Sequence, residues 1–187
     1  MKPLMILMLT IMLTASPLVH GEAGVNRQEF KSANVQLKKC KVGKTTLYYD
    51  KGISAKKLKN AKKYIKHLPS KVQRCAKRVY ILRQKYYLKT CNKGLLNTDG
   101  YFIVERKQIY ISASAPIKDT LFHEFGHAYD CKSSPFSLSS AKKWKEITKK
   151  SMGKKYDPIE YFAEVFVDYF EDILEADYNY ICTKLEK

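Results

Sequence analysis

The segment Ile117–Asp130, with the sequence IKDTLFHEFGHAYD, decides what the chain can be, because it places two histidines four residues apart. Pro116, immediately before it, is typical of a helix start. Positions four residues apart lie on one face of a helix, so His123 and His127 would present both imidazoles together. Such a pair can bind one zinc ion, and Glu124 beside them can reach a water on that ion. The segment therefore predicts a helix that carries a metal site.

Two ordinary helix histidines beside a surface glutamate are the alternative interpretation of this motif. The apolar neighbours Leu121, Phe122 and Phe125 argue against it, because they indicate a buried helix. An imidazole on a buried helix needs a partner for its nitrogens. We therefore prefer the metal interpretation, with Zn2+ as the expected cofactor.

A catalytic zinc usually takes three protein ligands, so a further donor is needed. No histidine follows His127 in the chain, and the third ligand is therefore expected to be a carboxylate from a later helix. The stretch DPIEYFAE supplies one, because Asp157 can cap a helix whose first residue is Pro158. We predict that Glu160, in the first turn of this helix, is the third zinc ligand.

Glu160, Glu164 and Asp168 follow one another at spacings of four and would share one face of this helix. Three phenylalanines occupy the other side, so the helix is amphipathic and is expected to dock on the core. We predict that Glu164 orients a ligand imidazole through its second ring nitrogen. A solvated acidic stripe, with Asp157 and Glu160 forming a capping box, is the alternative.

These two segments together resemble a known family. The sequence HEFGHAYD, followed about thirty residues later by EYFAEVF, is similar to the catalytic domain of anthrax toxin lethal factor and of the small secreted Pro-Pro endopeptidases. The resemblance covers about residues 117–170. It implies a zincin-like peptidase in which both histidines of HEFGH and Glu160 bind zinc and Glu124 is the general base. Glu164 would be a supporting residue behind the ligands.

The chain departs from this family pattern just before the ligand glutamate. The family places an oxyanion-stabilising tyrosine seven residues before it, where this chain has Gly153, and Tyr156 is the nearest substitute. We predict that Tyr156 takes this catalytic role; the alternative is an ordinary interface aromatic. In zincin-type folds an edge strand just before the active-site helix pairs with the extended substrate, and Gln108–Ser112 is predicted to be that strand.

The rest of the pattern places strands first and helices last, which predicts an α+β fold. By the resemblance it would be zincin-like, with a small N-terminal mixed sheet with helices, then the active-site helix and C-terminal helices. Asn92–Gly100 is expected to be a loop. The predicted strands are Thr45–Tyr49, Val79–Leu82 and a hairpin of Tyr101–Val104 with Ile109–Ser112. Helices are predicted from Ser54 to about Leu68, after Ser70, from Pro116 to about Cys131, after Ser139 or Ser140, and from Pro158.

The first residues are expected to be a targeting segment. Lys2 precedes an apolar run, Leu4–Leu13, which is shorter than the roughly 20 residues that span a bilayer. A charged start, an apolar stretch and small residues are typical of a secretory signal, with cleavage expected after Gly21. The expected organisation is a signal peptide, 1–21, and a single metallopeptidase domain, 22–187. An uncleaved anchor is the alternative.

An exported chain can form disulfides. The number of cysteines is odd, so two bridges with one free thiol and full reduction both remain open. The five residues are Cys40, Cys75, Cys91, Cys131 and Cys182.

Positive charge dominates the chain, with 35 Lys and Arg against 18 Asp and Glu and a formal net charge of +17. From Lys38 to Lys93 there are nineteen basic residues and a single acid, Asp50. Such a block can hold a polyanion by releasing its counterions. A solvated face that keeps the protein soluble is the alternative. The block lacks a recognisable nucleic-acid motif, which favours the solvated face. If the block does bind a partner, an anionic cell-surface polymer or an acidic substrate would suit the excess charge equally well.

These patterns favour a secreted, monomeric zinc endopeptidase that acts on protein or peptide substrates outside the cell. Two alternatives remain. The first is a secreted basic binding protein on the same scaffold, with a non-catalytic metal site. The second is a structural domain that binds no metal.

Overall fold

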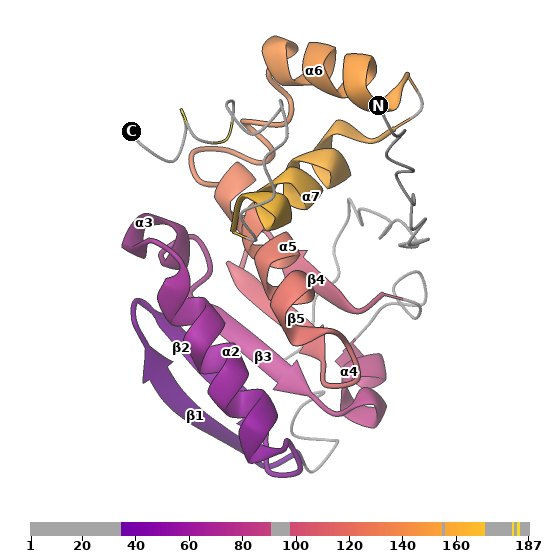
Figure 1. The fold of residues 1–187 in the computed structure, drawn as a ribbon. Coiled ribbons are helices and arrows are strands. Elements are labelled where there is room, and N and C mark those ends of the chain that lie inside the picture. The colour runs from indigo at the N-terminus through magenta and orange to yellow at the C-terminus, as the bar shows by residue number, and fades with distance from the viewer. Residues whose placement is uncertain (1–34, 91–97, 155, 171–180, 182, 184–187) are drawn as a thin grey trace, which may run out of the picture.

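The computed structural model describes residues 35–90, 98–154, 156–170, 181 and 183, and these residues form a mixed α+β fold (Figure 1). They contain one five-stranded sheet and six helices, so the expected α+β class is confirmed. The predicted signal peptide, 1–21, and most of the predicted loop at 92–100 lie outside the described residues. Within the described part, no helix is both long and apolar enough to cross a membrane.

The sheet has the strand order β1-β2-β3-β5-β4 and mixes parallel with antiparallel pairs. Its strands are β1 (Leu37–Val42), β2 (Thr45–Asp50), β3 (Arg78–Leu82), β4 (Gly100–Ile103) and β5 (Gln108–Ser112). The helices are α2 (Ala55–His67), α3 (Ser70–Gln73), α4 (Gln84–Thr90), α5 (Ile117–Asp130), α6 (Lys142–Met152) and α7 (Pro158–Phe170). Antiparallel pairing joins β1 to β2 and β4 to β5, whereas β3 runs parallel to both β2 and β5. Parallel neighbours need long crossovers, and α2 with α3 lies in the first of them.

The prediction that Gln108–Ser112 is an edge strand is wrong. This strand, β5, pairs with β3 on one side and with β4 on the other, and β4 is the outer strand of the described sheet. All five residues of β5 are buried, as expected for a strand covered on both faces. The hairpin was predicted correctly. The sequence could not show which of its two strands lies at the edge of the sheet, because both are short and apolar.

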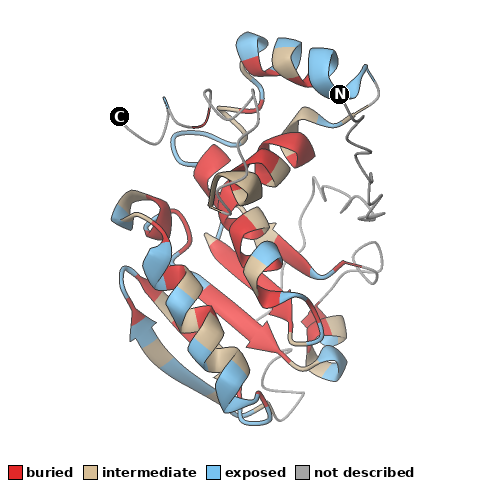
Figure 2. Ribbon diagram, in the orientation of Figure 1, coloured by how far each residue is buried: buried red, intermediate tan, exposed pale blue. Residues whose placement is uncertain are grey.

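The two faces of the sheet carry different side chains. Alternate residues such as Leu47, Val79 and Ile109 point to the face covered by α2 and α5 and form the main core. On the reverse face, Tyr80 stacks on Tyr110 with 4.6 Å between ring centroids, and further tyrosines extend this row across the sheet. The central strands β3 and β5 are therefore buried on both faces, and Figure 2 colours them as buried.

The predicted N-terminal helices are confirmed. The Ser54 side chain accepts a hydrogen bond from the Lys57 backbone N–H and caps α2, which ends before Pro69. Strand β1 and helix α4 were not predicted. β1, with the sequence LKKCKV, is rich in lysine because it is an edge strand whose polar side chains meet water.

The C-terminal helices differ slightly from the expectation at α6. This helix begins at Lys142 rather than directly after Ser139 or Ser140, because Ser139 is held in the preceding turn. The Asp130 carboxylate, at the end of α5, accepts hydrogen bonds from the backbone N–H and the hydroxyl of Ser139. Trp144 is fully buried, and its Nε1 donates to the Pro158 carbonyl at 2.7 Å, which ties α6 to α7.

Among the described cysteines, Cys40, Cys75 and Cys131 are free thiols. Burial raises the pKa of Cys131 to about 11, so this thiol stays protonated near neutral pH. Cys91 and Cys182 lie outside the described residues.

Candidate metal centre

Helix α5 carries the two histidines as predicted. Their Nε2 atoms lie 3.1 Å apart, and the rings meet edge to face with 4.7 Å between centroids. Most of α5 is buried between the sheet and α7, so it is a rigid support for both imidazoles. The four-residue spacing alone produces this juxtaposition, because one helical turn brings positions i and i+4 together.

Helix α7 brings Glu160 to the same point. Its Oε2 lies 3.3 Å from His123 Nε2, and its Oε1 lies 3.6 Å from His127 Nε2. The carboxylate is buried, with 6% of the residue exposed. These three side chains form the one group of potential metal ligands found in the described residues. The structure therefore places all three predicted ligands together.

The distances among the three donors suit a tetrahedral zinc ion. Zinc binds nitrogen and carboxylate oxygen at 2.0–2.2 Å, which puts tetrahedral donors about 3.3 Å apart. The three measured separations of 3.1, 3.3 and 3.6 Å bracket this value. Two imidazoles and one carboxylate are also a donor set that catalytic zinc uses. These residues fit the ion.

The two neighbouring histidines keep the Glu160 carboxyl group ionised, which is the form that binds a cation. Burial alone would raise the pKa of this carboxyl, but hydrogen bonds from His123 and His127, and the charges of both rings, outweigh burial. The resulting pKa is about 2. Glu160 is therefore ionised at any physiological pH, as a metal ligand must be.

Gly126, inside HEFGH, allows α7 to approach α5 closely. A Cβ at this position would lie 2.9 Å from the Ala163 Cα and 3.1 Å from the Phe166 Cβ. The predicted docking of α7 is borne out, since Phe162 and Phe166 are fully buried against the core. Sequence reasoning missed the role of Gly126, although a glycine inside a helical pattern is itself a signal of close packing.

Glu124 lies beside the ligands in a dry environment. The residue is 2% exposed, and its Oε2 has no hydrogen-bond partner among the described residues. Burial is the main cause that raises its pKa to about 8; Glu160 adds to the rise and His123 opposes it. A carboxyl with this pKa can both accept and release a proton near neutral pH.

The first residue of β4 lies directly over Glu124. A Cβ on Gly100 would fall 3.0 Å from Glu124 Oε1 and 2.7 Å from the Thr120 side chain. The outer strand of the sheet thus starts at the candidate site. No sequence signal marked this contact, because Gly100 and Glu124 are far apart in the chain.

Tyr156 and Glu164 meet each other. The Tyr156 hydroxyl donates to the Glu164 carboxylate, at 2.6 Å from each oxygen. Burial, followed by this hydrogen bond, raises the pKa of Tyr156, so the phenol keeps its proton. The ring also packs edge to face on Tyr161.

The structure brings Glu164 onto Tyr156 and not onto an imidazole. No hydrogen bond joins Glu164 to an imidazole among the described residues, and His127 Nδ1 is buried there without a partner. Glu164 lies one turn beyond Glu160, and the segment before α7 brings Tyr156 onto it. Helix geometry fixes how far Glu164 lies from Glu160, but it does not fix where the segment before α7 lies. The sequence therefore could not show whether Glu164 contacts an imidazole or Tyr156.

The chain was compared with protein-family models, with curated proteins and with solved structures, and none of the three comparisons gives a match.

Proposed function

We propose that this protein is a secreted, zinc-dependent endopeptidase with a zincin-like fold, similar in its site to the catalytic domain of anthrax toxin lethal factor and the Pro-Pro endopeptidases. The observation that carries the proposal is the meeting of His123, His127 and Glu160 at the spacing of tetrahedral zinc ligands. Glu124, a buried glutamate, stands next to them, where a general base for peptide hydrolysis would be needed.

Zinc bound by these three residues would supply a Lewis acid that polarises a peptide carbonyl and makes water acidic. Glu124 is the proposed general base, and afterwards the acid that protonates the departing amine. Its burial matters, because a carboxyl with a pKa near 4 would be a weak base and would hold no proton for the amine. The unpartnered Oε2 is free for this exchange.

Tyr156 is the proposed oxyanion stabiliser. A phenol that keeps its proton can donate a hydrogen bond where negative charge develops in the transition state. Glu164 lies one turn after Glu160 on α7 and accepts the hydrogen bond of the Tyr156 hydroxyl, so we propose that it positions this phenol. In this scheme the Tyr156 hydroxyl donates its hydrogen bond to Glu164 in the free protein and to the substrate during the reaction.

The outer strand β4 is the proposed substrate edge, in place of β5. An extended peptide can add to a sheet edge through backbone hydrogen bonds, which brings a scissile bond to a fixed position. Gly100 starts this strand over Glu124, and its missing side chain lets the Glu124 and Thr120 side chains pack directly against the strand. A peptide added to this strand would therefore lie near the proposed general base. This arrangement suits protein or peptide substrates.

Metal analysis combined with a single variant tests the proposal. The purified protein should contain one zinc per chain and cleave members of a random peptide library, and a chelator should abolish cleavage. Glu124→Gln should retain zinc and lose activity by roughly 100- to 10,000-fold. Activity that survives complete metal removal would contradict the proposal. Zinc retained with no cleavage by the wild-type chain would instead favour the binding protein with a non-catalytic metal site.

A further inference from the structure

The N-terminal part of the molecule exposes positive charge without any exposed acid. The only Asp or Glu in residues 35–90 is Asp50. It is 1% exposed, and its carboxylate accepts hydrogen bonds from the Gly52 and Arg83 backbone N–H groups and from Arg83 Nε. The one acid of this region is therefore buried in an ion pair with Arg83, and no other acid within residues 35–90 can balance the exposed lysines.

Four of these lysines form a ridge on α2. They line an open hollow together with Ala55 and Leu58, and no acidic residue contributes to its walls. With 100° per residue, the four side chains project within a sector of about 100°, over about 10 Å of helix. We name this surface the α2 ridge; it consists of Lys59, Lys62, Lys63 and Lys66.

An ordinary solvated helix face does not look like this. Such faces interleave acids and bases at spacings of three and four, which gains a few tenths of a kcal/mol per pair. In the α2 ridge all neighbours at these spacings are lysines, such as Lys59 with Lys63, so they repel one another. Binding an anion would relieve that repulsion.

The chemistry of the ridge selects among anionic partners. Phe, Trp and Tyr are at most half-exposed throughout the described residues and none of them lines the hollow of the ridge, so the ridge offers no such ring for nucleic-acid bases to stack on. The exposed large apolar residue of the described part, Met152, belongs to α6 and not to the ridge, which offers nothing to insert into a membrane. Ala55 and Leu58 are the apolar residues that line the hollow, and two aliphatic side chains of this size are a small apolar centre for a protein interface. Lysines on flexible stems suit a linear chain of separate anionic groups.

We propose that the α2 ridge is a docking surface for a linear anionic polysaccharide, which holds the protein at a polymer-coated surface. The inference does not rest on the peptidase proposal, because the ridge shares no residue with the metal centre. From the sequence, anion binding could be attributed only to the whole basic block; the structure assigns it to one side of one helix.

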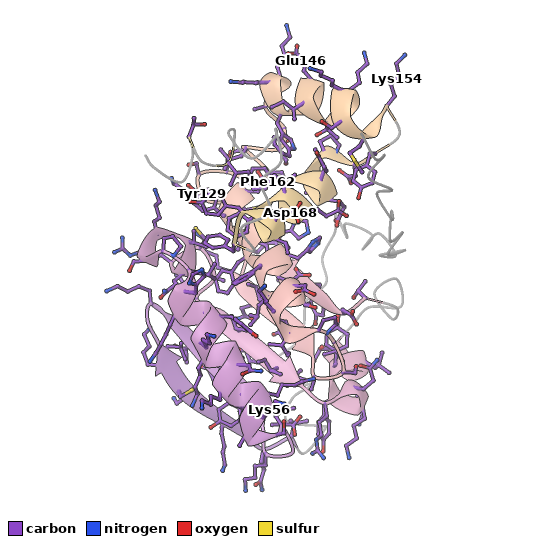
Figure 3. All side chains as sticks on the ribbon, viewed as in Figure 1. Lys56, Tyr129, Glu146, Lys154, Phe162 and Asp168 are labelled. Carbon is purple, nitrogen blue, oxygen red and sulfur yellow. The ribbon has the colours of Figure 1, made fainter. Side chains whose placement is uncertain are left out.

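A matched pair of variants tests this inference. The ridge variant replaces Lys59, Lys62, Lys63 and Lys66 with Gln. The control variant replaces Lys142, Lys145, Lys149 and Lys150 of α6 with Gln. Both remove four exposed or half-exposed positive charges from an amphipathic helix, but the control helix also carries an acid, Glu146. Figure 3 shows Lys56 of α2 at one end of the molecule and Glu146 of α6 at the other.

The probe is fluorescently labelled heparin, a sulfated polysaccharide, titrated with each protein at several salt concentrations. The wild-type chain should bind it at about 150 mM salt. The ridge variant should bind at least tenfold more weakly, and the slope of log affinity against log salt should fall by about three. The control variant should change the affinity less than threefold. Cleavage of a short neutral peptide should be unaffected in both variants, and neither variant should have a lower Tm than the wild-type chain.

Three results would overturn the inference. Equal weakening in both variants would mean that net charge alone attracts heparin. Absence of wild-type binding at that salt concentration would remove the docking surface. Preference for duplex DNA or for anionic vesicles over heparin, at equal charge concentration, would assign the ridge to another class of partner.

Discussion

Helices α2 and α7 are each 13 residues long and both pack on α5, yet they treat charge in opposite ways. In α2 the buried positions are Ala61 and Ile65, and no lysine of this helix is buried. In α7 a carboxylate, Glu160, lies in the interior together with large apolar residues. The buried Glu160 carboxylate is tolerated because two imidazoles face it. The lysines of α2 need no such partner because they are in contact with water.

The largest effect that separates the two helices should come from Glu160→Gln. Removing the anionic ligand should lower zinc affinity by more than about 100-fold, which exceeds the cost of losing a residue behind the ligands. Competition with a chromogenic chelator measures this. Glu164→Gln, the same change one turn further along α7, should keep stoichiometric zinc and lose mainly kcat, because Tyr156 is then less well held.

The second effect concerns pH in the metal-free protein. The pKa of Glu124 is raised from 4.5 to about 8, so the fold prefers its protonated form. The unfolded chain releases this proton first, and the free energy of unfolding should fall as pH rises through that window. Between pH 5 and 7 the loss should be roughly 2–3 kcal/mol, measured by urea unfolding with a chelator present. Glu124→Gln should flatten the slope; an unchanged slope would show that Glu124 is not buried as described.

Glu160 should act in the opposite direction at lower pH. Its pKa is lowered from 4.5 to about 2, so its contribution to stability is complete above pH 4.5 and is lost as pH falls toward 2. Glu160→Gln should abolish this loss of stability at acid pH. The loss of stability toward neutral pH that Glu124 causes should remain.

A smaller effect is expected from Gly126→Ala. The added Cβ would collide with the backbone of α7, at 2.9 Å from the Ala163 Cα. Overpacking typically costs 1–3 kcal/mol, and the better helix propensity of alanine returns about 1 kcal/mol. Stability should therefore fall by about 1 kcal/mol, and zinc affinity should fall with it because α7 is displaced. If both quantities stay at wild-type values, close helix contact is not what positions Glu160.

The smallest effect should be that of the α2 ridge variant on stability. Like-charge pairs at helical spacing cost 0.2–0.5 kcal/mol each, so replacing the ridge lysines with Gln should raise the free energy of unfolding by up to about 1 kcal/mol at low salt. The gain should vanish in 1 M salt, where charges are screened. A loss of stability larger than this would mean that the lysine stems support the core.

Local patterns were enough to predict much of the fold. Caps and helix breakers mark the ends of α2 and the start of α7, and β-branched and aromatic residues mark β2 and β3. The hairpin of β4 and β5 was also recognisable. What could not be predicted was which of these two strands lies at the edge, because that depends on the parallel pairing of β5 with β3.

In the candidate site, too, some features follow from local sequence and others depend on contacts between residues far apart in the chain. HEFGH places the two imidazoles together through the geometry of a single helical turn, so the amino-acid sequence alone determined that half of the metal centre. Whether Glu160 reaches them, whether Glu164 holds an imidazole or Tyr156, and which strand borders Glu124 were decided only by the tertiary structure. The physical reason is that helix geometry is set within a few residues, whereas the distance between helices is set by contacts such as Gly126 with Ala163, which join residues far apart in the chain.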